Sequence, residues 1–169
     1  MKVRVILVGG FLGAGKTTLL WEVARHFSER NIKVGLITND QATGLVDTSF
    51  LERSGGVVHE VSGSCFCCNF NGLTQAIIQA ANVERCQVIV AEPVGSCTDL
   101  SATIVQPLKE KFQDDMEVAP LSVLVEPTRL RDILNGGTSG LHDSAAYILR
   151  KQLEEADVIL ISKIDLFHE

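Results

Sequence analysis

A glycine-rich segment of the chain has the residue types that can hold a phosphate group. It fits the pattern G-x-x-x-x-G-K-[ST] and lies between a predicted strand and a predicted helix. Its residues are Gly10, Phe11, Leu12, Gly13, Ala14, Gly15, Lys16 and Thr17, followed by Thr18. Glycines let several N–H groups point at one phosphate, and the amino end of the helix adds favourable dipole charge. Lys16 should reach the β- and γ-phosphates and Thr17 should bind Mg²⁺. The Lys-Thr pair favours a nucleoside triphosphate site over a simple glycine-rich turn.

Two acidic residues follow apolar runs that we interpret as buried strands. Asp40 comes directly after residues 36–39, and Glu92 comes directly after residues 88–91. An acid at the end of a buried strand is costly unless it meets a cation or hydrogen-bond donors. We therefore predict that Asp40 and Glu92 bind Mg²⁺ and contribute to catalysis, with Glu92 in a Walker-B-like position. The alternatives are a solvent-exposed strand end at Glu92 and a simple turn at Asp40.

A tetrapeptide near the end of the chain has residue types that can recognise a nucleotide base. Ser162, Lys163, Ile164 and Asp165 follow an apolar strand and resemble the Asn-Lys-x-Asp guanine motif of GTPases, with serine in the first place. The aspartate of that motif accepts hydrogen bonds from the ring N–H and the amino group of guanine. Adenine lacks that pair of donors, so Asp165 predicts GTP rather than ATP.

Three cysteines are packed into four residues. Cys65, Cys67 and Cys68 could together surround one soft metal ion and leave a fourth position open, which suits an ion that is handed on. Zn²⁺ is the first expectation. The alternatives are small buried cysteines that only fill the core and a strained disulfide between Cys67 and Cys68.

A closed zinc site needs a fourth ligand, and no histidine lies close to the cysteines in the sequence. Asp40, Cys97 and His59 are the candidates from elsewhere in the chain. For Cys86 and Cys97 a place in the hydrophobic core is the favoured interpretation. For His59, which falls in a predicted strand, a structural role with a satisfied side chain is favoured over metal binding.

Strand-like and helix-like patterns alternate along the chain. We predict strands at residues 3–8, 33–38, 57–61, 88–91, 121–125 and 158–161, and several are continuous apolar runs, as in parallel strands covered on both faces. A helix should begin near Lys16, two others should span residues 74–81 and 145–155, and weaker patterns occur at 48–53, 101–112 and 128–134. This alternation predicts an α/β fold with a doubly wound, mostly parallel sheet and helices on both faces. Ligands should bind beyond the carboxyl ends of the strands, where all the motifs fall.

The composition is that of a globular protein of one domain. The 169 residues are 46% hydrophobic and 21% charged, and the net charge is −6. Such a charge argues against a broad surface for nucleic acid or for an anionic membrane. The first apolar run passes into the glycine-rich segment without a cleavage site, so we expect a cytoplasmic protein rather than a secreted one.

Taken together, these motifs resemble the CobW/HypB/UreG family of P-loop GTPases, which deliver metals. The P-loop, the Cys-x-Cys-Cys motif, Glu92 with Gly95, and the base motif match the family in order and spacing. The resemblance implies a slow GTPase whose nucleotide state governs the binding and release of Zn²⁺, Co²⁺ or Ni²⁺. It implies a client metalloprotein or metallocofactor enzyme as partner, and it adds a homodimer as a candidate assembly.

The chain departs from the family pattern in three places. Residues 39–42 differ from the Asn-Glu-aromatic-Gly sequence of CobW-type members, Ser162 replaces asparagine, and the sequence ends at Glu169. Family members continue with another strand, and many add a C-terminal domain. We therefore expect residues 1–169 to be a P-loop GTPase domain truncated after the guanine motif, without a C-terminal domain.

The sequence thus predicts a GTP-binding and GTP-hydrolysing metallochaperone or metal-insertion factor. Two other classes stay open from the residues alone. One is an ATP-using P-loop kinase or ATPase, against which Asp165 argues. The other is a metal or redox sensor that binds nucleotide without turnover.

Overall fold

The strand β1 (Val3–Gly10) lies in the middle of a parallel sheet. In the computed structural model, which describes residues 2–39 and 51–166, the strand order is β3-β2-β4-β1-β6-β7, and β5 also pairs with β1. Every one of these pairs is parallel. The other strands are β2 (Val34–Thr38), β3 (Val57–Glu60), β4 (Val88–Glu92), β5 (Met116–Val118), β6 (Ser122–Val125) and β7 (Val158–Ile161).

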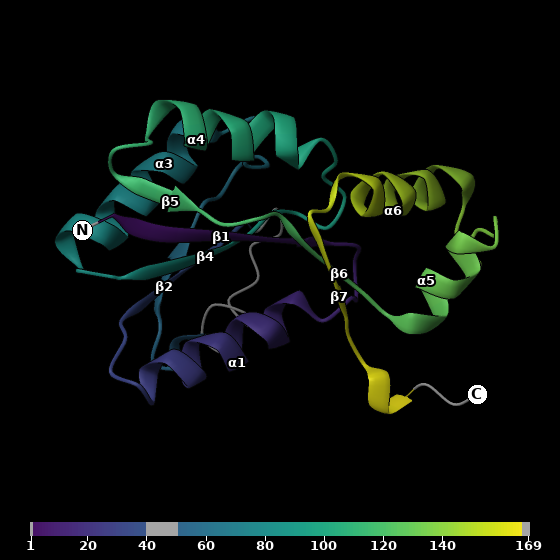
Figure 1. Cartoon of the computed structure of the whole chain (residues 1–169), viewed down its shortest axis with the longest axis horizontal. Helices are drawn as coiled ribbons and strands as arrows, with labels where there is room; N and C mark the ends of the chain where they lie inside the picture. Colours follow the sequence, from purple (N-terminus) through teal and green to yellow (C-terminus); the bar gives the residue numbers. More distant parts are fainter. Residues whose placement is uncertain (1, 40–50, 167–169) are drawn as a thin grey trace.

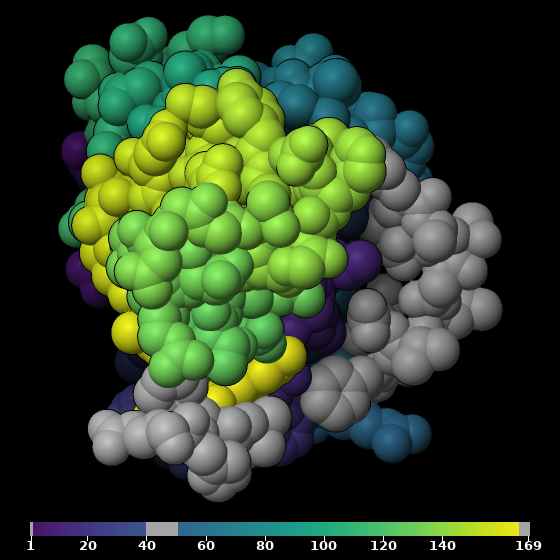
Figure 2. Space-filling view, turned by 90° about the vertical axis from the view of Figure 1, so that its right-hand side faces the viewer, coloured from purple at the N-terminus to yellow at the C-terminus, as the bar shows by residue number. Residues whose placement is uncertain are grey.

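Helices cover both faces of this sheet. The helix α1 (Lys16–Ser28) lies on one face, and α3, α4 and α6 lie on the other (Figure 1). Beyond α1 the helical elements are α3 (Phe70–Ile78) with its π-helical continuation (Gln79–Val83), a π-helical turn (Ser101–Val105) leading into α4 (Gln106–Lys111), α5 (Pro127–Leu134), α6 (Asp143–Glu155) and a 3₁₀ turn (Ile164–Leu166). Figure 2 shows α5 and α6 against each other at one end of the molecule. The predicted doubly wound α/β fold is therefore confirmed.

Alternate side chains of β1 enter the cores on opposite faces. Val5 and Leu7 are buried in a cluster that includes Leu73 of α3 and Leu108 of α4. Val8 is buried on the other face, together with residues of α1. Burial on both faces explains why the strands read as continuous apolar runs rather than as alternating ones.

Most predicted elements occur close to their expected positions, and the differences have local causes. The helix expected at 74–81 begins earlier, at Phe70, because the Asn69 side chain accepts a hydrogen bond of 3.0 Å from the Gly72 N–H and caps it. The short strand β5 was not predicted, since three residues with an exposed glutamate at the centre give no periodic signal. The helix expected at 48–53 falls partly outside the described residues.

Because the strands are parallel, their carboxyl ends meet at one edge of the sheet. The loops that follow β1, β2, β3, β4, β6 and β7 all begin at that edge. Among the described residues, no helix is long and apolar enough to span a bilayer.

Candidate nucleotide and metal site

The predicted phosphate loop joins the end of β1 to the beginning of α1. Gly10, Gly13 and Gly15 all have positive φ angles, of 139°, 78° and 97°. A Cβ on Gly10 would lie 2.5 Å from the Leu124 carbonyl oxygen, so glycine is required where the loop passes β6. The resulting curl of the backbone ends at the first turn of α1, which begins with Lys16. This is the strand–loop–helix geometry that the motif needs to bind phosphate.

Lys16 is buried at the centre of this loop. Only 6% of the residue is exposed, and its amine donates a hydrogen bond of 3.4 Å to the Phe11 carbonyl. The amine also lies 3.7 Å from Oε1 of Glu92, at the end of β4. Burial lowers the pKa of Lys16, and the attraction of the Glu92 carboxylate opposes that shift. The lysine is thus a partly desolvated cation, which strengthens its interaction with an anion.

Glu92 meets the phosphate loop at a second point. The Thr17 hydroxyl donates to Oε2 of Glu92 over 3.5 Å, and the glutamate side chain is only 16% exposed. A hydroxyl and a carboxylate at this spacing are hard oxygen ligands of the type that Mg²⁺ prefers. The fold thus brings the two predicted magnesium ligands together, whereas Asp40, the third, lies outside the described residues.

The segment that follows β4 passes directly over the phosphate loop. A Cβ on Gly95 would lie 3.1 Å from the Leu12 nitrogen and 3.3 Å from the Lys16 amine, so only glycine fits without a shift. Gln152 of α6 is 1% exposed, and its amide donates hydrogen bonds to the carbonyls of Gly95 (3.0 Å) and Cys97 (2.8 Å). The sequence interpretation missed Gln152, although a glutamine three residues after Leu149, on the apolar face of a predicted helix, is a signal that could have revealed it.

The base motif returns to the phosphate loop through its lysine. The Lys163 amine donates a hydrogen bond of 2.7 Å to the Gly13 carbonyl and lies 3.5 Å from Glu126, which directly follows β6. Ser162 is held by its own N–H, which donates to the Val125 carbonyl. Asp165 lies exposed in the 3₁₀ turn that follows. Glu126 is a second residue that sequence reasoning missed, although it ends an apolar strand just as Glu92 does.

The three clustered cysteines lie in a tight turn after β3. Their sulfur atoms are all within 4.8 Å of one another, and those of Cys65 and Cys67 are 2.8 Å apart. Phe66 between them is fully buried and anchors the turn in the core. Asn39, at the end of β2, donates hydrogen bonds to the carbonyls of Val61 and Ser64 and so holds the turn at the sheet edge.

The thiols of this turn do not ionise alike. Burial raises the pKa of Cys65, but hydrogen bonds, first from the Cys67 thiol and then from Cys68, outweigh that effect and hold the pKa at about 7. Burial raises the pKa of Cys67 to about 12, and its hydrogen bond to Cys65 and the negative charge of Cys65 add to that shift. Ionisation of one thiol of the cluster therefore makes ionisation of the next one less favourable in the absence of a metal ion. A divalent cation bound by the sulfurs would remove that repulsion.

The remaining candidates for metal ligands differ in position. His59 is in hydrogen-bonding contact with Glu84, with 2.7 Å between Nε2 and Oε2, as a structural histidine would be. Cys86 is buried, in line with the favoured interpretation, and is part of the core. Cys97 is buried as well, but its thiol is also in hydrogen-bonding contact with the Cys65 and Cys67 thiols.

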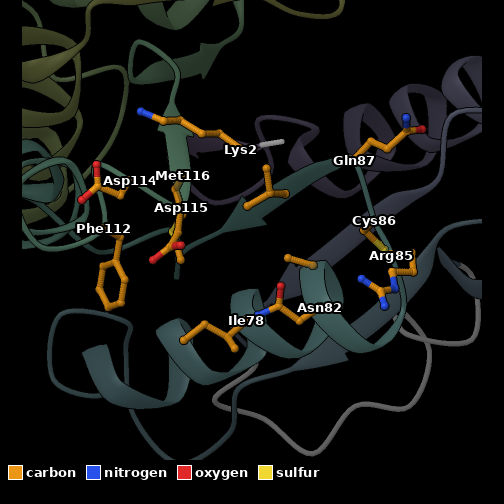
Figure 3. Close-up of a pocket in the computed structure, with 12 residues that line it drawn as sticks. Lys2, Ile78, Asn82, Arg85, Cys86, Gln87, Phe112, Asp114, Asp115 and Met116 are labelled. Carbon is orange, nitrogen blue, oxygen red and sulfur yellow. The ribbon is translucent and has the colours of Figure 1, made fainter.

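A large hollow lies at the opposite edge of the sheet. Its volume is about 690 Å³, and none of the predicted site residues lines it (Figure 3). The labelled residues around it include Lys2, Ile78, Arg85, Cys86, Phe112 and Asp115. Since ligands of doubly wound sheets bind beyond the carboxyl ends of the strands, this hollow is not the nucleotide site.

A comparison with known families agrees with this geometry. The profile of the CobW/HypB/UreG nucleotide-binding domain matches residues 4–169. The chain belongs to the CobW/HypB/UreG family. Two curated relatives are each 26% identical: the zinc chaperone YeiR of Escherichia coli, over 96% of this chain and 47% of the relative, and zinc-regulated GTPase metalloprotein activator 1 of Dictyostelium discoideum, over 99% and 41%.

Solved structures share the fold of this CobW/HypB/UreG domain. HypB of Helicobacter pylori in complex with nickel superposes with a TM-score of 0.65 at 18% identity, over 97% of this chain and 66% of that one. Zn(II)-bound YjiA GTPase from E. coli superposes with a TM-score of 0.62 at 20% identity, over 98% and 51%. The chain spans less than half the length of each of the two curated relatives named above.

Proposed function

We propose that this CobW/HypB/UreG domain binds and hydrolyses GTP and uses its nucleotide state to hold or release a divalent transition metal. Cys65, Cys67 and Cys68 carry the metal, which is passed to a client metalloprotein or metallocofactor enzyme. Zn²⁺ is the expected cargo, and the names of the two curated relatives, a zinc chaperone and a zinc-regulated GTPase, support that choice over Co²⁺ or Ni²⁺.

The observation that carries this proposal is that one short segment touches both sites. This segment begins at Glu92, which lies beside Lys16 and Thr17. It then crosses the phosphate loop at Gly95. It ends at Cys97, which contacts Cys65. A terminal phosphate that displaces the Gly95 backbone must therefore move residues next to the cysteine turn. Coupling between two ligands requires an element of this kind, whose position both ligands affect.

The residues around the phosphate loop divide the work of hydrolysis. Thr17 and Glu92 offer oxygen ligands for Mg²⁺, which neutralises charge on the phosphates when it is bound. Lys16 supplies a buried positive charge to the terminal phosphates. Asp40 stays a proposed ligand or catalytic acid, and Lys163 and Asp165 form the base site, in which Asp165 selects guanine.

Two measurements test the nucleotide part of the proposal. Competition binding should give a higher affinity for GTP than for ATP, and equal affinities would favour an ATP-using kinase or ATPase. Multiple-turnover release of phosphate from GTP should exceed that of a Lys16→Ala control. Rates equal to that control, with GTP still bound, would favour a sensor without turnover.

The cysteine turn also has a direction in which an ion could leave. Cys68 is exposed, whereas Cys65 and Cys67 are half-buried. A thiolate of a client protein therefore reaches the ion at Cys68 first, and the displaced Cys68 thiolate takes up a proton from solvent; the deeper sulfurs follow. Transfer of ⁶⁵Zn²⁺ to a thiol-rich acceptor peptide should be faster from a Cys68→Ser variant that retains the ion, because the thiolate that the client must displace first is already absent. An unchanged rate would remove this step.

A further inference from the structure

Cys97 comes from a different part of the fold than the other three clustered cysteines. It follows β4, whereas the others follow β3, and β2 lies between these two strands in the sheet. Nevertheless the Cys97 thiol is in hydrogen-bonding contact with the thiols of Cys65 and Cys67. The Cys97 thiol therefore lies beside the cysteine turn at the carboxyl edge of the sheet, next to the group formed by Cys65, Cys67 and Cys68.

The backbone around Cys97 is held firmly. Its N–H donates 3.0 Å to the Val94 carbonyl, which closes a turn, and its carbonyl accepts 2.8 Å from the buried amide of Gln152. The residue is only 9% exposed, whereas Cys68 is exposed. A cysteine that only fills a core has no need of neighbouring thiols, whereas a metal ligand does.

We propose that Cys97 is the fourth thiolate ligand of the metal bound by Cys65, Cys67 and Cys68. This inference rests on the proposed function and narrows its cargo. Four sulfur ligands in a tetrahedron favour Zn²⁺, whereas Ni²⁺ and Co²⁺ have less preference for such a site. Each thiol that joins the ion releases its proton to solvent, so every ligand of the cation is a thiolate of this chain.

The arrangement gives the site two sides. Cys97 closes it toward the core, and Cys68 remains at the surface. The three sulfurs within 4.8 Å of one another are those of the turn. Because Cys97 is not one of these three, its loop or the turn must move for Cys97 to complete the tetrahedron when the ion binds.

The number of sulfur ligands can be counted directly. X-ray absorption of the Zn²⁺-loaded protein should give four sulfur atoms near 2.3 Å, the usual Zn–S distance, and a Cys97→Ser variant should give three sulfurs with one oxygen. With Co²⁺ as probe, the sulfur-to-cobalt charge-transfer absorption should fall by about one quarter in that variant, since one of four thiolates is lost. Zn²⁺ affinity should fall at least about tenfold, because even the loss of a residue that only hydrogen-bonds to a metal ligand lowers metal affinity by about that factor. Cys86→Ser, at the opposite edge of the sheet, is the matched control and should change none of these values.

The outcomes separate this inference from the function on which it rests. One Zn²⁺ per chain with three sulfurs, unchanged in Cys97→Ser, would overturn the role of Cys97 and leave the metal site intact. Absence of stoichiometric metal in the wild-type protein would overturn both. If Cys97→Ser unfolds, a Cys97→Ala variant with the thermal melt recorded in the metal-free and Zn²⁺-loaded states gives the answer. A ligand predicts a smaller stabilisation by Zn²⁺ than in the wild type, and a core residue predicts an equal one.

Discussion

The amine of Lys163 donates a hydrogen bond of 2.7 Å to the main-chain carbonyl of Gly13. These residues are 150 positions apart in the sequence, and the bond joins the base motif to the middle of the phosphate loop. Lys163 has a positive φ angle of 52°, so its backbone adopts an unfavourable conformation to reach that position. We conclude that the two ends of the nucleotide site support each other.

Replacing Lys163 with alanine should therefore weaken GTP and ATP alike. The lost bond is charge-assisted and partly exposed, so we expect a loss of affinity of about 3- to 10-fold. Isothermal calorimetry with both nucleotides would measure it. Lys109→Ala, an exposed lysine of α4, is the control. An affinity equal to that of the control would show that the bond to Gly13 does not support the site.

Asp165 should determine the choice of base. In an Asp165→Asn variant one of the two acceptor oxygens becomes a donor, which opposes the ring N–H and amino group of guanine. The ratio of GTP to ATP affinity should fall about tenfold or more, because the mismatched group is left without a partner. Asp114→Asn, an exposed residue at the opposite edge, is the control. A ratio that stays constant would remove Asp165 from base recognition.

Lys16 should matter for nucleotide binding and little for stability. Burial lowers its pKa, so the folded protein binds the lysine proton less tightly than the unfolded chain does. The charge therefore adds no stability to the fold, and Lys16→Ala should melt within a few degrees of the wild type. Its GTP affinity should nevertheless fall at least about tenfold, since the cation that faces the phosphates is gone. Calorimetry and a thermal melt measure both, and unchanged GTP affinity would refute the phosphate-site assignment.

Cys65 should be the first thiol of the cluster to react. Its pKa of about 7 lies below the ordinary thiol value, so the thiolate is present at and above pH 7 and is lost as the pH falls through that value. In metal-free protein the rate of alkylation by iodoacetamide at Cys65 should rise with a midpoint near pH 7. Cys67, with a pKa of about 12, should react far more slowly. Peptide mass spectrometry distinguishes the two sites, and a Cys65 midpoint near that of Cys67 would contradict the assignment.

The sequence was enough to predict at which edge of the sheet the motif residues meet, because the carboxyl ends of parallel strands lie at one edge. Once the runs before Glu92 and Ser162 were interpreted as parallel strands, their following residues had to meet at one edge. Gln152 and Glu126 could not be assigned a role in the same way. The role of Gln152 depends on the Gly95 carbonyl that it meets, which is decided by the packing of α6 against the loop after β4. The role of Glu126 depends on its contact with Lys163, which is decided by the pairing of β6 with β7.

Cys97 illustrates the same limit. From the sequence it was both a core residue and a candidate ligand, because its distance from Cys65 along the chain contains no information about their separation in space. The pairing of β4 and β3 with β2 brings the two loops together. The Cys97 thiol is buried, as expected for the core. It also contacts the cysteine turn, and this contact could be found only once the strand order was known.

The cysteine pair Cys67 and Cys68 separates metal binding from nucleotide binding. Replacing both with serine should remove the bound ion, because a neutral hydroxyl is a poor ligand for a soft metal. GTP affinity without metal should stay within about twofold, since Lys16 and Thr17 lie on another loop and neither substituted side chain contacts the nucleotide. Metal content and a thermal melt of both proteins would decide. A large loss of melting temperature would indicate a structural zinc site instead.

The central claim is that metal and GTP are coupled, and one thermodynamic cycle tests it. Zn²⁺ affinity is measured by competition with a chelator in the presence of Mg²⁺, once with GDP and once with a GTP analogue that is not hydrolysed. Nucleotide affinities are then measured with and without Zn²⁺. The account predicts that Zn²⁺ affinity changes at least about fivefold between the two nucleotide states, and that the nucleotide affinities change by the same factor, as linkage requires. In the Cys67→Ser, Cys68→Ser protein, which lacks the ion, addition of Zn²⁺ should leave the nucleotide affinities unchanged. Equal Zn²⁺ affinity in both nucleotide states of the wild type would contradict the account.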